Sequence, residues 1–217
     1  MIAYSSICSG RHYRALLRAS WGMLFAPYAL TKFGPHVREY QESPPARYCL
    51  DNGAWSEHRG TASFDPAAFR ELVERLGPRA DFVVSPDVVG GGRESLRLSV
   101  KWLPELLQTC RRVLIPTQDG LTKRDLRPYL GPRVGLFVGG SDEHKLGTLR
   151  QWGALASSVG CWLHVGRVNS ARRIEYCGIA GADSFDGSGA ARFGPIKLEL
   201  YERARRAASI QASLFSK

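Results

Sequence analysis

Acidic and amide side chains follow several short apolar runs of the chain, each at the point where the run ends. A carboxylate in such a position can serve as a nucleophile or as a general acid or base. The last of these carboxylates is followed by the small residues GSGAAR, and glycine allows the main chain to come close to a ligand. The residues that could do chemistry are Asp51, Asp87, Gln118 and Asp186.

Each of these residues also has an ordinary structural interpretation. Asp51 opens the sequence DNG, which is typical of a turn, and Asp87 follows a proline, where it could cap a helix. Asp186 could be a helix cap as well. His164 lies within an apolar run, where a hydrogen-bonded core or rim position is the commoner role. The glycines at 90–92 lack the GxGxxG spacing, so they indicate no dinucleotide site. The catalytic interpretation depends on all these residues lying at the same end of their strands.

The elements that would position them alternate regularly along the chain. Short apolar runs without polar alternation are typical of buried parallel strands. Eight are predicted, at Ile2–Cys8, Gly22–Ala26, Tyr48–Leu50, Phe82–Ser85, Val113–Pro116, Val134–Val138, Trp162–Val165 and Asp183–Phe185. Helical spacing predicts helices at Pro66–Leu76, Glu94–Thr109, Asp142–Ser157 and Pro195–Ser213, with weaker patterns near 11–19 and 30–41. Asp65 and Ser141 are the expected N-caps of the first and third of these helices.

This alternation predicts an α/β fold, a compact (β/α)8 TIM-type barrel forming a single domain over residues 1–217. A doubly wound open sheet is the alternative. In a barrel the active site lies at the carboxyl ends of the strands, which is where the candidate residues fall.

The composition favours a polyanionic partner. The chain has 217 residues, a net charge of +10 and a pI near 9.7, and nucleic acid is the commonest partner of such a basic protein. The alternative is that the charge only aids solubility. The five cysteines include no CxxC pair, so a disulfide framework or a cysteine zinc site is not expected. No signal peptide and no apolar run of membrane-spanning length is visible, which predicts a cytoplasmic protein without membrane contact (the host cytoplasm if a phage encodes it).

An ordered set of motifs between about residues 48 and 193 resembles one enzyme family. The motifs are LDNGAW, SPDVVG, PTQDG, GLFVGG, WLHVGR and DSFDGSGAAR. They look like the tRNA-guanine transglycosylase superfamily, and most like the small DpdA-type relatives that phages use to put 7-deazaguanines into DNA. The resemblance implies a glycosyltransferase that exchanges guanine in DNA for a preQ0-like base through a covalent aspartyl-glycosyl intermediate. It implies no cofactor, and DNA and a 7-deazaguanine base as partners.

The resemblance also implies a role for individual residues. Asp186 matches the nucleophile, and Asp51 matches a general acid/base candidate. The base-binding positions match Trp55, Asp87, Gln118, Gly139, Gly140 and, in a looser alignment, His164. Arg192 matches an arginine of the substrate-strand loop. Independently of the resemblance, a basic rim that neutralises phosphates is expected, with Arg167, Arg172, Arg173 and Arg192 as the candidate nucleic-acid contacts.

The chain departs from the tRNA-modifying members of that family, which carry a cysteine-rich zinc site near the C-terminus. Nothing after Asp186 could form this site, since the last cysteine is Cys177. We therefore expect no bound metal and a DNA substrate rather than tRNA. Three alternatives remain: the same exchange on RNA, a non-catalytic barrel that binds nucleic acid, and a barrel enzyme that uses GSGAAR to hold the phosphate of a small metabolite.

Overall fold

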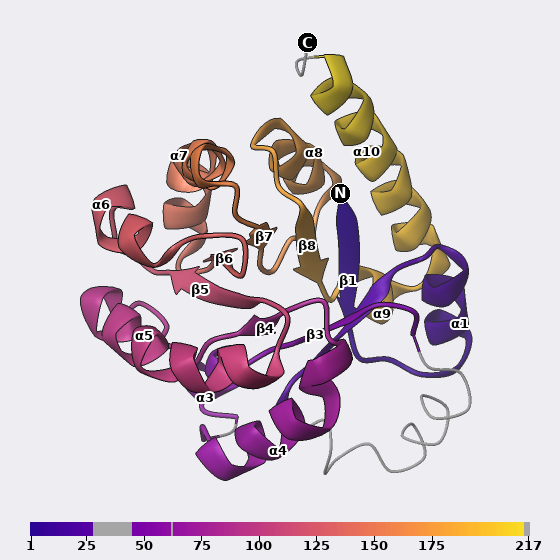
Figure 1. The fold of residues 1–217 in the computed structure, drawn as a ribbon. Helices are drawn as coiled ribbons and strands as arrows, with labels where there is room; N and C mark the ends of the chain where they lie inside the picture. The colour runs from indigo at the N-terminus through magenta and orange to yellow at the C-terminus, as the bar shows by residue number, and fades with distance from the viewer. Residues whose placement is uncertain (28–44, 62, 215–217) are drawn as a thin grey trace.

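Eight parallel strands close into a barrel in the computed structural model, which describes residues 1–27, 45–61 and 63–214 (Figure 1). The strands are β1 Ile2–Ser6, β2 Gly22–Phe25, β3 Tyr48–Leu50, β4 Val83–Val84, β5 Val113–Thr117, β6 Val134–Val138, β7 Leu163–Val165 and β8 Ser184–Gly187. Each strand pairs with the next one in the sequence, and β1 closes the ring by pairing with β8, with Ile2 opposite Ser184. The predicted (β/α)8 barrel is confirmed, and the open sheet is excluded.

Helices cover the outside of the barrel. They are α1 Gly10–Arg18, α3 Ala54–His58, α4 Pro66–Leu76, α5 Gly92–Thr109, α6 Lys123–Leu126, α7 Asp142–Val159, α8 Ala171–Ile179, α9 Gly189–Phe193 and α10 Pro195–Leu214, with 3-10 turns at Gly77–Arg79 and Arg127–Tyr129. The four long helices lie where the sequence predicts them. Asp65 caps α4 by accepting hydrogen bonds from the amides of Ala67 and Ala68, and Ser141 caps α7 by accepting one from the amide of His144. The expected helix at 30–41 lies outside the described residues.

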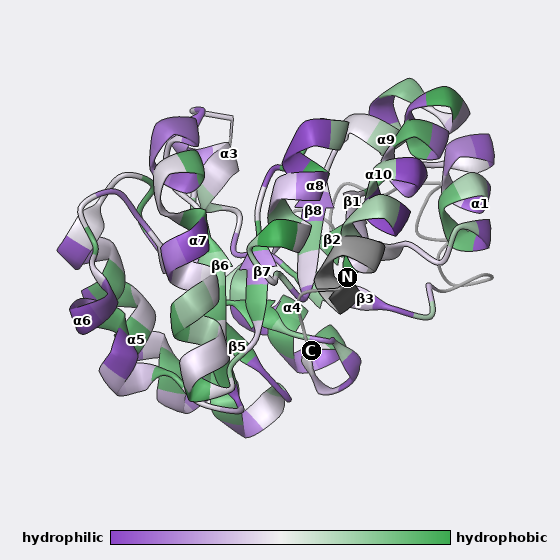
Figure 2. Ribbon diagram, turned by 90° about the horizontal axis from the view of Figure 1, so that it is seen from above, coloured by the Kyte–Doolittle hydropathy of each residue, from purple (hydrophilic) through white to green (hydrophobic). Residues whose placement is uncertain are grey.

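The strands separate two apolar layers. Tyr4, Cys49, Phe82, Val84 and Leu114 fill the inside of the barrel, and a larger cluster packs between the strands and the helices. In the ribbon of Figure 2, hydrophobic residues lie on the central strands, and the surrounding helices carry both hydrophobic and hydrophilic residues. Because both sides of most strands are buried, most strands are continuous apolar runs, whereas β8 alternates the polar Ser184 and Asp186 with the apolar Phe185.

The barrel interior determines where polar side chains emerge. Alternate residues of a strand point to the same side. Asp51 therefore follows Cys49 and Asp186 follows Ser184 on the inward side, one step nearer the carboxyl end. This geometry directs both carboxylates toward the same mouth of the barrel.

Three further features bear on the sequence predictions. All five cysteines are free thiols, and Cys49, Cys110, Cys161 and Cys177 are buried. Within residues 1–27, 45–61 and 63–214, no group of three or more His, Cys, Asp or Glu side chains is arranged to hold a metal ion. None of the described helices combines the length and apolar character that a membrane span requires.

Candidate active site

One cavity of about 390 Å³ opens at the carboxyl ends of the strands. The four residues singled out first from the sequence, Asp51, Asp87, Gln118 and Asp186, all line it. So do Trp55, Gly139, Gly140, Arg167, Arg173 and Arg192. The structure thus brings together side chains from strands and loops that are up to about 140 residues apart in the chain.

Asp87 is the centre of a buried hydrogen-bond network on one wall of the cavity. Its Oδ1 accepts a hydrogen bond from Asn52 Nδ2 at 2.7 Å, and its Oδ2 accepts one from Gln118 Nε2 at 2.5 Å. Gln118 Oε1 accepts from the amide of Gly90 at 3.0 Å, which fixes the orientation of the amide group. All three polar side chains are less than 10% exposed. This wall is therefore a rigid set of donors and acceptors.

Asn52 is a member of this network that the sequence analysis missed. Its Nδ2 donates to both Asp87 and the carbonyl of Ser85, and its Oδ1 accepts from the amide of Ala54 at 2.8 Å. The last bond is an Asx turn, so the turn interpretation of DNG is correct in part. The only signal in the sequence was the DNG turn itself, which does not show that the asparagine also reaches a carboxylate on the next strand.

The pKa values of two carboxyl groups in the cavity are raised. Burial, with a smaller contribution from the charges of Asp186 and Asp87, raises the pKa of Asp51 to about 7, against the opposing effect of hydrogen bonds from the amides of Gly53 and Asn52. Burial raises the pKa of Asp87 to about 6, although the bonds from Asn52 and Gln118 oppose this change. Asp51 can therefore both give and take a proton near neutral pH, as a general acid/base must.

Both carboxylate oxygens of Asp186 have hydrogen-bond partners. His164 Nε2 lies 3.0 Å from Oδ1, and the backbone amide of Arg167 donates to Oδ2 at 3.3 Å. The Asp186 side chain is 15% exposed, so part of it still faces the cavity. A carboxylate in this state is oriented and accessible at once.

The structure gives His164 a different place from the expected one. We predicted it at the face of a bound base, but it is fully buried inside the barrel and lies beneath Asp186. Its ring stacks on Phe137, with the centroids 5.1 Å apart and the planes at 20°. The inward side of β7 points the imidazole away from solvent, which explains the difference.

Trp55 and Arg167 meet at the mouth of the cavity. The Arg167 guanidinium lies 3.8 Å from the centroid of the Trp55 ring, which is typical of a cation–π contact, and it also donates to the carbonyl of Gly140. Arg167 has a φ of +58°, a conformation that costs energy for a residue with a side chain and is concentrated at functional sites. A base that stacks on Trp55 must share the indole with this guanidinium.

The other arginines differ in their position relative to the cavity. Arg192 is exposed and lines it, 5.6 Å from the centroid of Phe193. Arg173 also lines it but is paired with Asp142 at 2.7 Å. Arg172 is exposed on α8 and is not among the lining residues. Of the predicted nucleic-acid contacts, Arg192 is the exposed cation at the cavity, and Arg172 lies outside it.

The glycines after Asp186 are required by the protein's own packing. A Cβ at Gly187 would collide with the carbonyl of Val168, and one at Gly189 would collide with the ring of Tyr201. We expected these glycines to make room for a ligand. The space beside them is instead taken by the β7–α8 loop and by α10.

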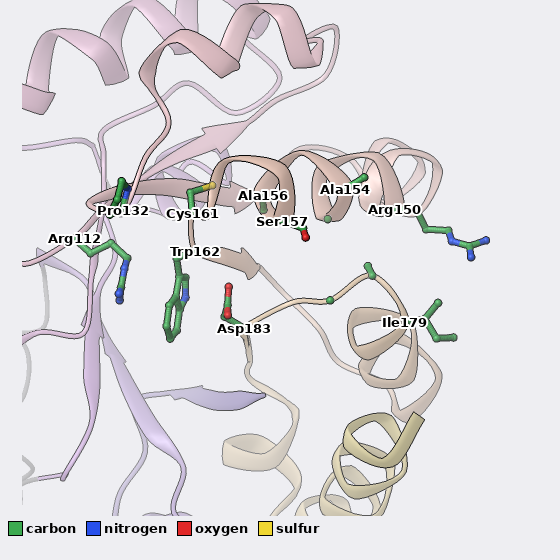
Figure 3. A pocket seen from close by; sticks show the side chains of 14 residues that line it. Arg112, Pro132, Arg150, Ala154, Ala156, Ser157, Cys161, Trp162, Ile179 and Asp183 are labelled. Atoms are coloured by element: carbon green, nitrogen blue, oxygen red, sulfur yellow. The ribbon is translucent and has the colours of Figure 1, made fainter. Parts of the chain in front are cut away.

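A larger cavity of about 700 Å³ lies at the opposite end of the barrel (Figure 3). Its wall includes Arg112, Trp162 and Asp183, which precede β5, β7 and β8. The Arg112 guanidinium lies 4.2 Å from the centroid of the Trp162 ring. Of the described residues that line this cavity, only Asp183 is acidic. Although it is larger, it lacks paired carboxylates, so the smaller cavity is the candidate active site.

Comparison with known proteins shows the fold and no family. The sequence matches no protein-family model, and no curated protein is a significant match. Similar solved structures include an HpcH/HpaI aldolase from Desulfitobacterium hafniense (TM-score 0.54, 11% identity, 97% of this chain and 92% of that one). Phosphoribosyl anthranilate isomerase from Thermus thermophilus is also similar, with a TM-score of 0.53 and 13% identity over 97% of this chain and 100% of that one. So is 3-hexulose-6-phosphate synthase from Salmonella typhimurium, with a TM-score of 0.50 and 10% identity over 98% of this chain and 100% of that one.

These comparisons contradict the resemblance to the tRNA-guanine transglycosylase superfamily and its DpdA-type members. The similar structures are a synthase, an isomerase and an aldolase, and no sequence-based family match supports the resemblance. The physical reason is that every (β/α)8 enzyme places polar residues and glycines at the carboxyl ends of its strands. An ordered set of such short motifs therefore follows the fold more than it follows a reaction.

Proposed function

We propose that this protein is an enzyme that exchanges a guanine-type base at an N-glycosidic bond of DNA. The observation that carries the proposal is the pair of carboxyl groups in one cavity: Asp186, with hydrogen-bond partners on both oxygens, and Asp51, whose pKa of about 7 suits proton transfer. The acceptor is a 7-deazaguanine base, which keeps the hydrogen-bonding edge of guanine.

The reaction needs one nucleophile and one acid. The Asp186 carboxylate attacks C1′ of the sugar while the bond from C1′ to the base nitrogen breaks, and that bond's electron pair leaves with the base. Protonated Asp51 gives its proton to the departing base. The products of this step are an aspartyl-glycosyl ester and a free guanine.

The second half of the reaction reverses the roles. Asp51, now ionised, takes a proton from the incoming base, whose nitrogen attacks C1′. The bond between C1′ and the Asp186 oxygen breaks, and its electrons return to the carboxylate. Both halves use the same two side chains, so no further reactant is needed.

The buried wall of the cavity suits a guanine-type edge. A guanine offers N–H donors beside a carbonyl acceptor. Asp87 can accept from the donors, and the Gln118 amide can give a hydrogen bond to the carbonyl. Both groups are already oriented by Asn52 and Gly90, so base binding exchanges partners within a fixed network.

The charge of the chain suits a polyanionic substrate. The net charge is +10, and Arg192 is exposed at the cavity. A target nucleotide must leave its stack to reach Asp186, and cations around the mouth can hold the flanking phosphates.

The test is base exchange followed by nucleoside mass analysis. DNA is incubated with the protein and a 7-deazaguanine base, with an RNA of the same sequence as a parallel arm. We expect the new nucleoside in DNA and a protein–DNA adduct on a denaturing gel. Asp186→Asn should abolish both, because a neutral amide cannot form a stable glycosyl ester.

Asp183→Asn is the matched control. It makes the same substitution three residues earlier, before β8, at the opposite end of the barrel, and its side chain can still accept the bond from the Leu163 amide. It should keep wild-type exchange. Exchange by Asp186→Asn at the wild-type rate would assign the nucleophile elsewhere, and no exchange on either nucleic acid by the wild type would refute the proposal.

A further inference from the structure

A continuous hydrogen-bond chain runs beneath Asp186 through the interior of the barrel. Trp162 Nε1 donates to Ser184 Oγ at 2.9 Å, and Ser184 Oγ lies 2.8 Å from His164 Nδ1. His164 Nε2 lies 3.0 Å from Asp186 Oδ1. Ser184 and His164 are both completely buried, so the chain is enclosed by the protein.

The first donor fixes the direction of the whole chain. An indole nitrogen can only donate, so Ser184 Oγ accepts from Trp162. The serine hydroxyl has a hydrogen of its own, and the acceptor in its reach is His164 Nδ1. His164 Nε2 then carries the ring proton and donates it to Asp186. The other tautomer would place a nitrogen lone pair against the carboxylate oxygen.

Aromatic rings prevent the imidazole from turning away. Phe137 stacks on it, Phe82 has its centroid 4.9 Å away, and the Tyr4 ring lies 6.0 Å away. The ring is therefore fixed by packing on its faces and by hydrogen bonds at both nitrogens. His164 is therefore not expected to contact the substrate, and it can act only through Asp186.

We propose that His164 is the positioning residue of Asp186, with Ser184 and Trp162 setting its tautomer. This inference deepens the proposed function and rests on it. His164 and the Arg167 amide together aim the carboxylate at C1′. In the second half of the reaction, the His164 Nε2–H bond also stabilises the negative charge that returns to Asp186 when the C1′–O bond breaks.

The first experiment tests the arrangement without any activity. Protein labelled with ¹⁵N-histidine is studied by long-range proton–nitrogen NMR, and the His164 signals are assigned from their loss in His164→Gln. We expect Nε2 to be the protonated nitrogen and Nδ1 the bare one. Ser184→Ala should mix the two tautomers. A protonated Nδ1 with a bare Nε2 in the wild type would overturn the inference.

The second experiment compares two amides at position 164. Gln places a donor where Nε2 lies, whereas Asn reaches only the position of Nδ1. A hydrogen bond to an ionised group corresponds to about 10- to 100-fold in a rate constant. His164→Asn should therefore lower kcat by about this factor at an unchanged KM for the free base, and His164→Gln should restore part of it. The covalent adduct should accumulate in the Asn variant because its breakdown is slowed.

These outcomes separate the inference from the proposed function. If the wild type exchanges bases and the Asn and Gln variants both match it, the positioning role is wrong. If the wild type exchanges no base, the proposed function fails, and the NMR result still decides whether His164 donates to Asp186. If His164→Asn does not fold, the Ser184→Ala variant takes its place, with a smaller fall in kcat expected and an unchanged kcat contradicting the inference.

Discussion

Replacing Asp51 with asparagine should make the protein more stable above pH 7 while it removes activity. Burial and the Asp186 charge raise the pKa of Asp51 from 3.8 to about 7 in the folded state. The unfolded chain releases this proton near its usual pKa. Between these two values the folded state binds more protons, so the free energy of unfolding falls as the pH rises. The ionised, half-buried carboxylate therefore lowers the free energy of unfolding above pH 7, and asparagine does not have this effect.

The size of the effect follows from the two pKa values. Each pKa unit corresponds to 1.36 kcal/mol, so the rise from 3.8 to about 7 corresponds to about 4 kcal/mol as an upper bound. For a chain of this length, 1 kcal/mol moves the melting temperature by about 2–4 °C. The variant should unfold up to about 8–16 °C higher at pH 8. At pH 5 the gain should shrink to about 1–2 kcal/mol, because the wild-type carboxyl group is then protonated in the folded state.

The assay is thermal unfolding by circular dichroism at pH 5 and pH 8. Asp125→Asn is the control, since Asp125 accepts hydrogen bonds from Thr122 that lower its pKa, and its loss should give no gain at pH 8. An Asp51→Asn variant that melts at or below the wild-type temperature at pH 8 would refute the explanation by burial. Unchanged base exchange in that variant would refute the acid/base role.

Three further predictions concern the walls and the mouth of the cavity. Gly189→Ala should cost about 1–3 kcal/mol of stability, because its Cβ would meet the Tyr201 ring, and an unchanged melting temperature would contradict this packing. Arg192→Ala should weaken DNA binding and reduce by about 1 the slope of log affinity against log salt concentration, whereas Arg172→Ala, outside the cavity, should do neither. Equal effects of the two variants in a salt titration would contradict the placement of DNA at the cavity. Gln118→Leu should raise the KM for the free base in exchange assays, and an unchanged KM would show that Gln118 does not bind the base. The same variant should have a lower melting temperature, because the Gly90 amide loses its hydrogen-bond acceptor.

The barrel was predictable because its strands are buried on both sides. Such strands leave short continuous apolar runs, as at Val113–Pro116, and all eight runs are strands in the structure. The short helices α3 and α9 were not predicted, because five residues are too few to reveal a helical period.

The candidate site was predictable in its location more than in its hydrogen bonds. Asp51 and Asp186 were predicted to share one cavity because parallel strands carry their polar ends to one mouth, and both line that cavity. The place of His164 depends on the register of β7 and β8, which sets it opposite Ser184. This register cannot be predicted from the local sequence of either strand. The two hydrogen bonds of Asn52 toward the next strand are hidden for the same reason.

The crowding around Gly187 and Gly189 limits how this protein can evolve. Any larger side chain at either position would displace Val168 or Tyr201. The segment that carries Asp186 therefore tolerates few substitutions, including those through which enzymes acquire new substrates. The positions at the cavity mouth in the loops after β3 and β7 are under less constraint, because Trp55 is 39% exposed and Arg167 reaches it across the mouth. Laboratory selection for a different base should therefore collect its substitutions in those two loops and leave the sequence from Ser184 to Gly189 intact.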